Sequence, residues 1–554
     1  MRDTLSIHHT IRSSLVIAAA LAVGCGDDTA MSGTATDSGG GSSSGGATDP
    51  TPPTSTSGNS DSATSDSTMG GSDSQTGSTT GTTEPTTEGV TSGPTTETTS
   101  TTDPGTSSTT TGDTTSSTIS DTSTTVGDTS TSTTTGDAST STTGEGSSTT
   151  GDDTTGGNEV LPGSCRLSEL YGSAGARPAF TDPNYANFLG KQVAITTTSQ
   201  QQTQFLLHVV DISGPTPPPN INYAAPRYSH PSWTVANLGR IFGLTLDSFG
   251  NIYVAASAAY GPTQNPGVIR RIDAVTGAIT VFATLPNNGP SLGNLNYDCV
   301  SETIYVSNHE DGRIYQYNLK GEVMSTYRHS TKNVTLGLPN DPGEPNGVFT
   351  PLGDRVWGVQ SHAGRLYYGV WWEDTNRSNA QQNNEVWSVA YVDTAGVPDP
   401  ATAKLEFKLP DGLLNPIADI SFAADGRMLV ARRTMTGDTQ SLAHQSNVLT
   451  YESVNGTWQP LGELHKVGEL VNSAAGGVDH DFAPNGYVWM TGDALDFYTP
   501  NVVYGLQGTP LAGGAIQQST LIDLDSNLTA QAKTAQGDVE VPIPDDVQPV
   551  PPPK

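Results

Sequence analysis

A strand–turn–strand pattern recurs through the C-terminal part of this chain, and it limits the fold more than any other feature of the sequence. Each copy has an apolar strand, a tight polar turn that often contains Gly, and a second apolar strand. A third strand follows after a polar loop, and we expect these third strands at residues 268–272, 313–317, 385–389, 447–451 and 502–504. The clearest copies span residues 242–254, 418–430 and 478–490, and weaker copies span residues 294–306 and 355–369. A repeat of this kind indicates one supersecondary unit used several times.

The repeat has a period of about sixty residues. Successive spacings are 52, 62, 62 and 60 residues, counted along Gly243, Leu295, Trp357, Asp419 and Asp479. Extrapolation by one period reaches about residue 188 upstream and about residue 539 downstream. Residues 205–212 and 233–238 supply strands for a further upstream copy.

A sheet of three or four such strands has two apolar faces and is not stable alone. Radial packing of the sheets around an axis buries both faces and protects the sheet edges. Because antiparallel strands repeated at this period are typical of β-propellers, the sequence predicts an all-β fold with a six-bladed β-propeller over residues 158–540. Five and seven blades are the alternatives that the spacing leaves open.

The N-terminal third of the chain cannot form such a core. All aromatic residues lie at or after Tyr171, and no Lys or Arg occurs between Arg12 and Arg166. Residues 26–157 carry 18 Asp and Glu among Ser, Thr and Gly, and therefore a charge of −18. We expect residues 25–157 to be a disordered acidic tether; low-complexity filler without a selected length is the alternative. Residues 541–554 read as a Pro-rich disordered tail.

The charge distribution also bears on partners. The net charge of the chain is −32, and its few basic residues form no patch or run. Nucleic-acid binding depends on a basic surface that neutralises phosphates. We therefore expect no nucleic-acid partner.

The first residues have the features of a secretory signal. Arg2 and Arg12 make the start basic, residues 13–23 form an 11-residue apolar run, and Cys25 follows Ala22-Val23-Gly24. This ending resembles the lipobox of bacterial lipoproteins. The resemblance implies that residues 1–24 are removed as a lipoprotein signal peptide and that Cys25 carries the lipid. The chain would then be anchored in a bacterial cell envelope, at the outer membrane or cell surface. An ordinary signal followed by a chance Cys is the alternative.

Two further cysteines, Cys165 and Cys299, lie 134 residues apart. In an oxidising compartment they could form one disulfide that closes a long loop. Two unpaired buried thiols are the alternative, because sequence alone does not place them within bonding distance.

The blade sequences carry a family resemblance. Residues 247–254 (DSFGNIYV) resemble the blades of NHL-type and gluconolactonase/senescence-marker-type propellers, and residues 345–347 (PNG) are similar to a motif before an inner strand of the gluconolactonase type. The resemblance implies a propeller over about 350 residues. It specifies function only weakly.

Polar residues are predicted to gather at one mouth of the propeller, where the first strand of a blade starts and its second strand ends. The strand starts offer Asp419, Asp479 and His480; the strand ends offer Asn308, His309, Trp371, Arg432, Arg433 and Asp493. Oxygen ligands of this kind suit a hard cation, above all Ca²⁺. The alternative is that such Asp side chains only bond turn amides or face solvent.

Gluconolactonase-like propellers and paraoxonases hold a divalent metal at one mouth and use it to polarise a lactone or ester carbonyl. On that resemblance Asp419, Asp479 and Asn308 would be the metal ligands and His480 a candidate catalytic base. We find no residue that corresponds to the family's early Glu ligand.

Residues 370–374 (VWWED) could form an aromatic platform for a sugar; blade packing with one exposed Trp is the alternative. The sequence thus leaves three functions. The leading hypothesis is a monomeric, envelope-anchored lipoprotein that displays a β-propeller binding module for a carbohydrate or protein ligand. The alternatives are a calcium-dependent lactonase or esterase and a structural envelope protein, so whether the chain is an enzyme stays open.

Overall fold

Strands dominate the computed structural model, which describes Cys165 and residues 175–198, 205–214, 220–379, 381–423, 425–482, 486–496, 502–524 and 535–543. All of these belong to the second of two compact units, which begins at Thr142. The predicted signal peptide, Cys25, the tether and residues 544–554 of the tail lie outside the described residues. No helix within the described ranges is both long enough and apolar enough to cross a bilayer.

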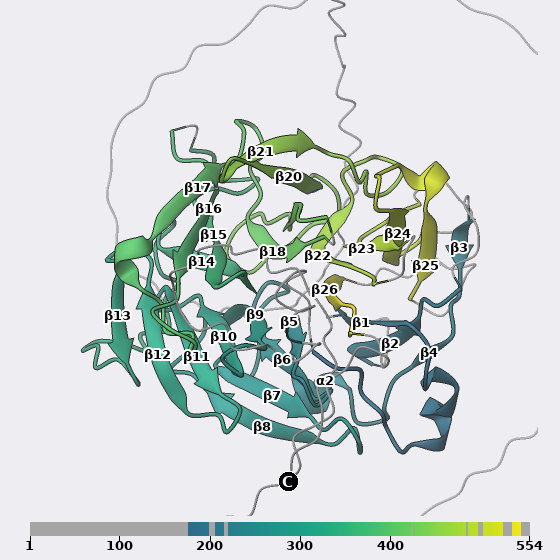
Figure 1. Ribbon diagram of the computed structural model, residues 1–554, viewed down its shortest axis with the longest axis horizontal. Coiled ribbons are helices and arrows are strands. Elements are labelled where there is room, and N and C mark those ends of the chain that lie inside the picture. The colour runs from purple at the N-terminus through teal and green to yellow at the C-terminus, as the bar shows by residue number, and fades with distance from the viewer. Residues whose placement is uncertain are drawn as a thin grey trace, which may run out of the picture. The chain divides into compact units, whose positions relative to one another are not determined.

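Six sheets stand in a ring, so the predicted six-bladed β-propeller is confirmed (Figure 1). Blade 1 contains β26 (Gln536–Glu540), β1 (Val193–Thr198), β2 (Leu207–Asp211) and β4 (Arg227–Tyr228). Blade 2 contains β5 (Ile241–Leu246), β6 (Ile252–Ala256), β7 (Val268–Ile272) and β8 (Ile279–Thr284). Blade 3 contains β9 (Leu292–Asp298), β10 (Thr303–Asn308), β11 (Arg313–Asn318), β12 (Val323–Arg328) and β13 (Asn333–Leu336).

The remaining sheets complete the ring. Blade 4 contains β14 (Arg355–His362), β15 (Arg365–Trp371), β16 (Glu385–Ala390) and β17 (Lys404–Lys408). Blade 5 contains β18 (Ile417–Phe422), β19 (Met428–Arg432), β20 (Val448–Val454) and β21 (Thr457–Gly462). Blade 6 contains β22 (Ala474–His480), β23 (Tyr487–Gly492), β24 (Gly505–Pro510), β25 (Thr520–Asp523) and the parallel strand β3 (Asn220–Tyr223). The described helices are all short: α2 (Val235–Leu238), η1 (Pro183–Phe188), η2 (Pro400–Thr402) and η3 (Ile516–Gln518).

The inner strands contact one another in the order β26, β5, β9, β14, β18, β22 and back to β26. Blade 1 closes this ring with strands from both ends of the domain, because β26 pairs antiparallel with β1. The extrapolated inner strand near residue 188 therefore does not exist. Its place is taken by the C-terminal strand that the period located near residue 539.

Most of the expected strands form, but two do not. Residues 233–238 contain α2, since the chain turns there and continues into β5. Residues 502–504 precede the third strand of blade 6, which begins at Gly505. In both places a short apolar run is packed as a connection, which hydropathy alone does not distinguish from a strand.

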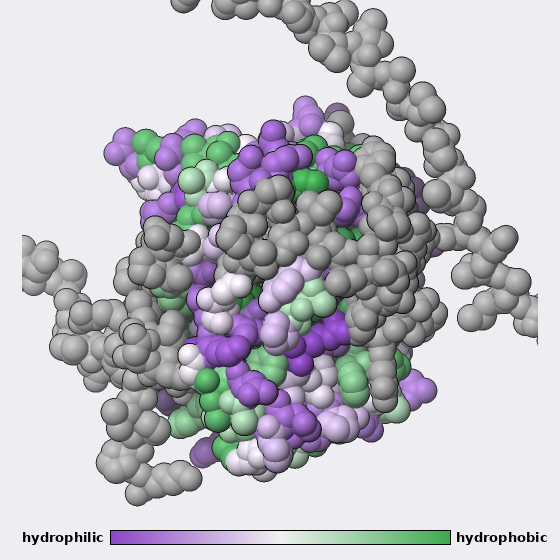
Figure 2. Space-filling view, turned by 90° about the vertical axis from the view of Figure 1, so that its right-hand side faces the viewer, coloured by the Kyte–Doolittle hydropathy of each residue, from purple (hydrophilic) through white to green (hydrophobic). Residues whose placement is uncertain are grey.

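The core lies between neighbouring blades. One cluster joins blades 1 and 2 through side chains such as Ile195, Val209 and Leu244. Another joins blades 2 and 3 and includes Cys165 and Cys299, which form a disulfide with a Cα–Cα distance of 5.2 Å. Each such apolar side chain gains roughly 1.5–3 kcal/mol when it is fully buried. The outer strands face solvent, and the described surface of one side of the ring mixes hydrophilic and hydrophobic residues (Figure 2).

Candidate functional site

The six inner strands share a four-residue motif that meets at the axis of the ring. Its second residue is aliphatic and pairs with the next strand outward in every blade. Its first and third residues are Gly or polar. We call these segments the axial motifs: residues 243–246, 294–297, 358–361, 419–422, 477–480 and 538–541.

The first positions of the axial motifs form a ring in which Gly alternates with a polar residue. Asn294, Asp419 and Asp538 come from blades 3, 5 and 1, and Gly occupies the position in blades 2, 4 and 6. The Asn294 amide donates to Asp419 Oδ1 at 3.2 Å, and the carboxyls of Asp419 and Asp538 are hydrogen-bonded to each other. Because these blades are not neighbours, the three side chains bridge the axis itself.

The alternating glycines provide the room for this arrangement. A Cβ on Gly243 would lie 2.3 Å from Asn294 Oδ1 and 2.8 Å from the Asn294 Cα. A Cβ on Gly477 would lie 2.8 Å from the Asp538 Cα. Three larger residues and three glycines therefore fill a space that six larger residues would overfill.

Backbone amides hold the two carboxyls in place. Asp538 accepts from the amides of Val539 at 2.9 Å and Leu244 at 3.2 Å. Asp419 accepts in the same way from the amide that follows it, at 2.8 Å, and from Val478 of the next blade, at 2.9 Å. Each carboxyl thus ties its own strand to the inner strand of the next blade.

A second ring lies two residues further along each inner strand, at the third positions of the axial motifs. Its members are Thr245, Asn296, Gln360, Ser421, Asp479 and Glu540. Asp479 accepts from the Ser421 hydroxyl at 2.9 Å and from the Val541 amide at 2.8 Å. The carboxyls of Asp479 and Glu540 are also hydrogen-bonded to each other. Together the two rings bring four carboxyl groups to the axis.

Burial sets the protonation of this group, which we call the axial acid cluster (Asp419, Asp479, Asp538 and Glu540). Desolvation, then repulsion from Asp538, raises the pKa of Asp419 well above its usual value. Desolvation also raises the pKa of Asp538, to about 7. The pKa of Glu540 is raised by desolvation and by the neighbouring carboxylates. In the described part of the chain, no Lys or Arg forms an ion pair with these four groups.

Carboxylate oxygens such as those of the axial acid cluster are ligands that suit a hard cation, but the arrangement of these oxygens does not fit a cation site. Ca²⁺ takes six to eight oxygen ligands. Both oxygens of Asp419 and of Asp538 already accept backbone amides, as described above. Within the described ranges, no group of three or more His, Cys, Asp and Glu has the geometry of a metal site. Shared protons account for the cluster as it stands.

Aromatic side chains cover the axis on the side where the inner strands begin, which we call the start face. Phe242 of blade 2 and Trp357 of blade 4 meet in an edge-to-face contact with ring centroids 5.1 Å apart. Trp371 lies against Trp357 at 5.6 Å, and the Arg355 guanidinium lies 4.6 Å above the Trp371 ring. Cross-axis packing of this kind closes the start face with side chains.

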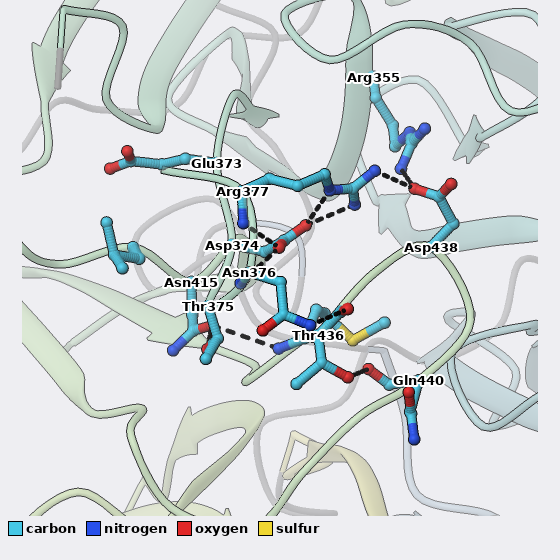
Figure 3. A network of polar contacts seen from close by, with 12 residues as sticks. Arg355, Glu373, Asp374, Thr375, Asn376, Arg377, Asn415, Thr436, Asp438 and Gln440 are labelled. Atoms are coloured by element: carbon cyan, nitrogen blue, oxygen red, sulfur yellow. Dashed lines mark hydrogen bonds and ion pairs between the residues drawn. The ribbon is translucent and has the colours of Figure 1, made fainter. Parts of the chain in front are cut away.

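An ion-pair network holds the loops above this aromatic layer (Figure 3). Asp438 bridges Arg355 at 2.6 Å and Arg377 at 2.7 Å, and Arg377 Nε donates to Asp374 at 2.7 Å. Arg355 is almost fully buried, and desolvation lowers its pKa despite the neighbouring Asp438. Two loops from blades 4 and 5 are thereby joined over Trp371.

The structure does not bring the predicted metal and catalytic residues together at one mouth. Asp479 and His480 lie at the end of β22, so their placement at a strand start is wrong. Asn308 ends β10 as expected, but it is buried and bonded to Pro286 O at 3.0 Å and to the Asn287 amide at 2.7 Å. Only Asp419 and Asp479 share the axial cluster, where His480 Nδ1 lies 3.6 Å from Asp479 Oδ1.

The other candidates have structural partners. Arg433 pairs with Asp493 at 2.8 Å and lies over the Tyr260 ring. Arg432 donates to Asn447 at 2.8 Å. Burial, followed by the charge of Arg355, lowers the pKa of His309 to about 3. Trp371 is only 1% exposed and offers no ring face to a sugar, whereas Trp372 is half-buried.

Sequence reasoning missed Asn294, Asp538 and Glu540. The signal was present in the axial motifs, because residues 419–421 (DIS), 477–479 (GVD) and 538–540 (DVE) follow one rule: small or acidic, aliphatic, polar. The sixty-residue spacing makes Asp479 equivalent to Asp419, but in the observed register the equivalent of Asp419 is Gly477, two residues earlier.

No protein-family model and no curated protein sequence matches this chain. It is similar to solved propeller structures at low identity. A putative 6-phosphogluconolactonase from Bacteroides uniformis matches at 10% identity, covering 64% of this chain and 99% of the other, with a TM-score of 0.36. The periplasmic gluconolactonase of Pseudomonas aeruginosa matches at 13% identity, covering 63% and 98%, with a TM-score of 0.34.

A structure of a nidogen/laminin complex matches equally well, at 11% identity, covering 64% of this chain and 98% of the other, with a TM-score of 0.35. Gluconolactonases and a protein–protein complex thus appear side by side among the matches. A shared propeller does not specify a ligand.

The axial acid cluster predicts a pH dependence of stability. The pKa values of Asp419, Asp538 and Glu540 are raised, so the folded chain keeps protons which the unfolded chain releases near pH 4, and stability falls as the pH rises from about 4 through about 7. For Asp538 alone the fall in the free energy of unfolding between pH 5 and pH 8 is about 2–3 kcal/mol. Denaturant unfolding should show a smaller fall in Asp538→Asn, whereas exposed Glu452→Gln should match the wild type. An equal fall in Asp538→Asn would contradict this assignment.

Proposed function

We propose that this chain is a monomeric lipoprotein of the bacterial envelope that displays a β-propeller binding module for a carbohydrate or protein ligand. The proposal combines the lipobox-like start, the acidic tether composition and the closed propeller. The tether sequence would hold the propeller away from the membrane. Recognition would take place on the outer surfaces and rims of the ring.

The observation that supports binding at the outside is the filled axis. The Phe242–Trp357 contact and the Asn294–Asp419 hydrogen bond both cross it. Enzymes commonly enclose a small substrate in a concave site, whereas here side chains occupy the axis. A ring with loops on its rims suits a binding surface, since loops on a rigid scaffold commonly carry recognition.

A calcium-dependent lactonase or esterase is the competing function. The specific observation in its favour is the axial acid cluster, whose four carboxyls are of the type that holds Ca²⁺. For a cation to bind, the carboxyls would have to lose their shared protons and rearrange their amide contacts. A purely structural envelope role is the third candidate, and it requires no small ligand.

Ligand-dependent stabilisation separates these functions, because a ligand that binds only the folded state raises the melting temperature. We expect the same melting temperature in 1 mM CaCl₂ and in a chelator, and no hydrolysis of D-glucono-δ-lactone above the uncatalysed rate. We also expect at least one member of a soluble glycan panel to raise the melting temperature by several degrees, as saturation at about 100 Kd adds about 2.7 kcal/mol.

Two outcomes would overturn this expectation. Calcium-dependent stabilisation, with lactone turnover that Asp538→Asn abolishes, would favour the hydrolase. No stabilisation by any glycan, together with no retention of envelope proteins on the immobilised chain, would favour the structural role.

The lipid anchor has its own test. In a bacterial host given an alkyne-tagged fatty acid, the wild-type chain should incorporate the tag and sediment with membranes. Cys25→Ser should lose both properties, because it removes the thiol that would be acylated. Cys165→Ser serves as the matched control and should keep the tag. Equal tagging of Cys25→Ser and wild type would contradict the anchor.

A further inference from the structure

The chain reaches the propeller on the end face, which we define as the side of the ring where the inner strands end. Cys165 is joined by its disulfide to Cys299, in the turn that connects β9 with β10 of blade 3. Both cysteines are buried in the cluster between blades 2 and 3. The chain is therefore bonded covalently to blade 3 before it enters β1 of blade 1.

Residues 175–181 form a strap that crosses blade 2 on the same face. Four backbone amides of the strap donate to blade 2 carbonyls at 2.7–2.9 Å, those of Leu246, Asp247, Ala274 and Val275. The fit is close, because a Cβ on Gly175 would lie 2.0 Å from the Asp247 oxygen. These contacts are hydrogen bonds, which can break one after another when the strap is pulled.

The strand that closes the ring follows the strap in the sequence. Among the described strands β1 is the one partner of β26. Ile195 pairs with Glu540, so the first residues of β1 lie beside the last residues of β26. A pull on the N-terminal side of β1 would load this antiparallel ladder at its end, where the hydrogen bonds break in turn. Loss of β1 would release β26 and open the ring.

We propose that the Cys165–Cys299 disulfide is a mechanical clamp, which carries a pull on the N-terminal tether into blade 3 and keeps that pull off the strap and β1. Such a pull arises when the tether is anchored and a bound partner moves away, so the role in the cell rests on the proposed function. In the disulfide-bonded chain the force passes from Cys165 through the sulfur–sulfur bond to Cys299. The hydrogen bonds of the strap and of the ring closure then carry no load.

Blade 3 can take this load because it is packed on both sides. It is a five-stranded sheet, and its apolar side chains contact blade 2 through one buried cluster and blade 4 through another. A pull at Cys299 is shared by both interfaces, since the blade moves only if many close-packed side chains leave their neighbours together. A pull at the start of β1 meets one hydrogen bond at a time.

Single-molecule pulling on the full chain tests the clamp. One handle is placed on the tether sequence and the other in the exposed turn between β20 and β21, at Asn455. In Cys165→Ser we expect an early rupture that releases the strap and β1 and lengthens the molecule by roughly 100 Å. This rupture should occur at about half the wild-type force or less. Cys299→Ser should behave in the same way, and the wild type should lack the early rupture.

A second pulling geometry separates the path of the load from stability, because removal of a disulfide also lowers stability. With the handles at the C-terminus and at Asn455, no force enters through the tether. Cys165→Ser should then rupture at the same force as the wild type.

Two results would overturn the clamp. The first is the absence of the early rupture in Cys165→Ser when the tether is pulled. The second is equal weakening of Cys165→Ser in both geometries, which would make the disulfide a general stabiliser only. Cys25→Ser should leave all of these force curves unchanged, so a failed lipid-labelling test would remove the anchor without changing the result for the clamp.

Discussion

The structure depends on how six inner strands fill the line on which they converge. Side chains from all six strands point into the same narrow space, and a void there would remove contacts from every blade at once. This chain meets the constraint by alternation: Asn294, Asp419 and Asp538 reach across the axis, and glycines stand between them. The filling is polar, so its cost is offset by hydrogen bonds to backbone amides of the neighbouring blades.

The polar filling determines the electrostatics of the axis. Four carboxyls so close together cannot all be ionised without a counter-charge. The raised pKa values of Asp419, Asp538 and Glu540 are consistent with protons in that role. The same protons let Asp419 donate to Asp538, so the cluster acts as a set of hydrogen bonds across the ring. With the Phe242–Trp357 pair on the start face, the axis becomes a structural element.

The fold could be predicted from the sequence because strand alternation and the sixty-residue period survive in each blade. Residues 268–272 were expected as a third strand and form β7 with these same bounds. The closure of the ring could not be predicted from the period, because β26 and β1 lie at opposite ends of the domain. Residues 233–238 were expected as a strand and contain α2, because hydropathy alone does not distinguish a strand from a buried connection.

The candidate site was predictable only in part. Asp419 and Asp479 were selected as acidic residues on inner strands, and both lie in the axial acid cluster. Asn308 was selected for its position at a strand end, but an amide at such an end can equally bond the adjacent turn, as it does here. The carboxyls of the axial acid cluster share protons because inner strands of alternate blades bring them together at the axis. The sequence repeat does not encode these distances, so the protonation could not be predicted from it.

The central claim is that alternating glycines and polar side chains fill the axis, and the free energy of unfolding of Gly243→Ala tests it most directly. The added Cβ would meet the Asn294 side chain and backbone at 2.3 and 2.8 Å, whereas a Cβ on Gly214 would meet nothing within 4 Å. We predict a loss of about 1–3 kcal/mol for Gly243→Ala and no loss for Gly214→Ala. Equal stability of the two variants would contradict the account.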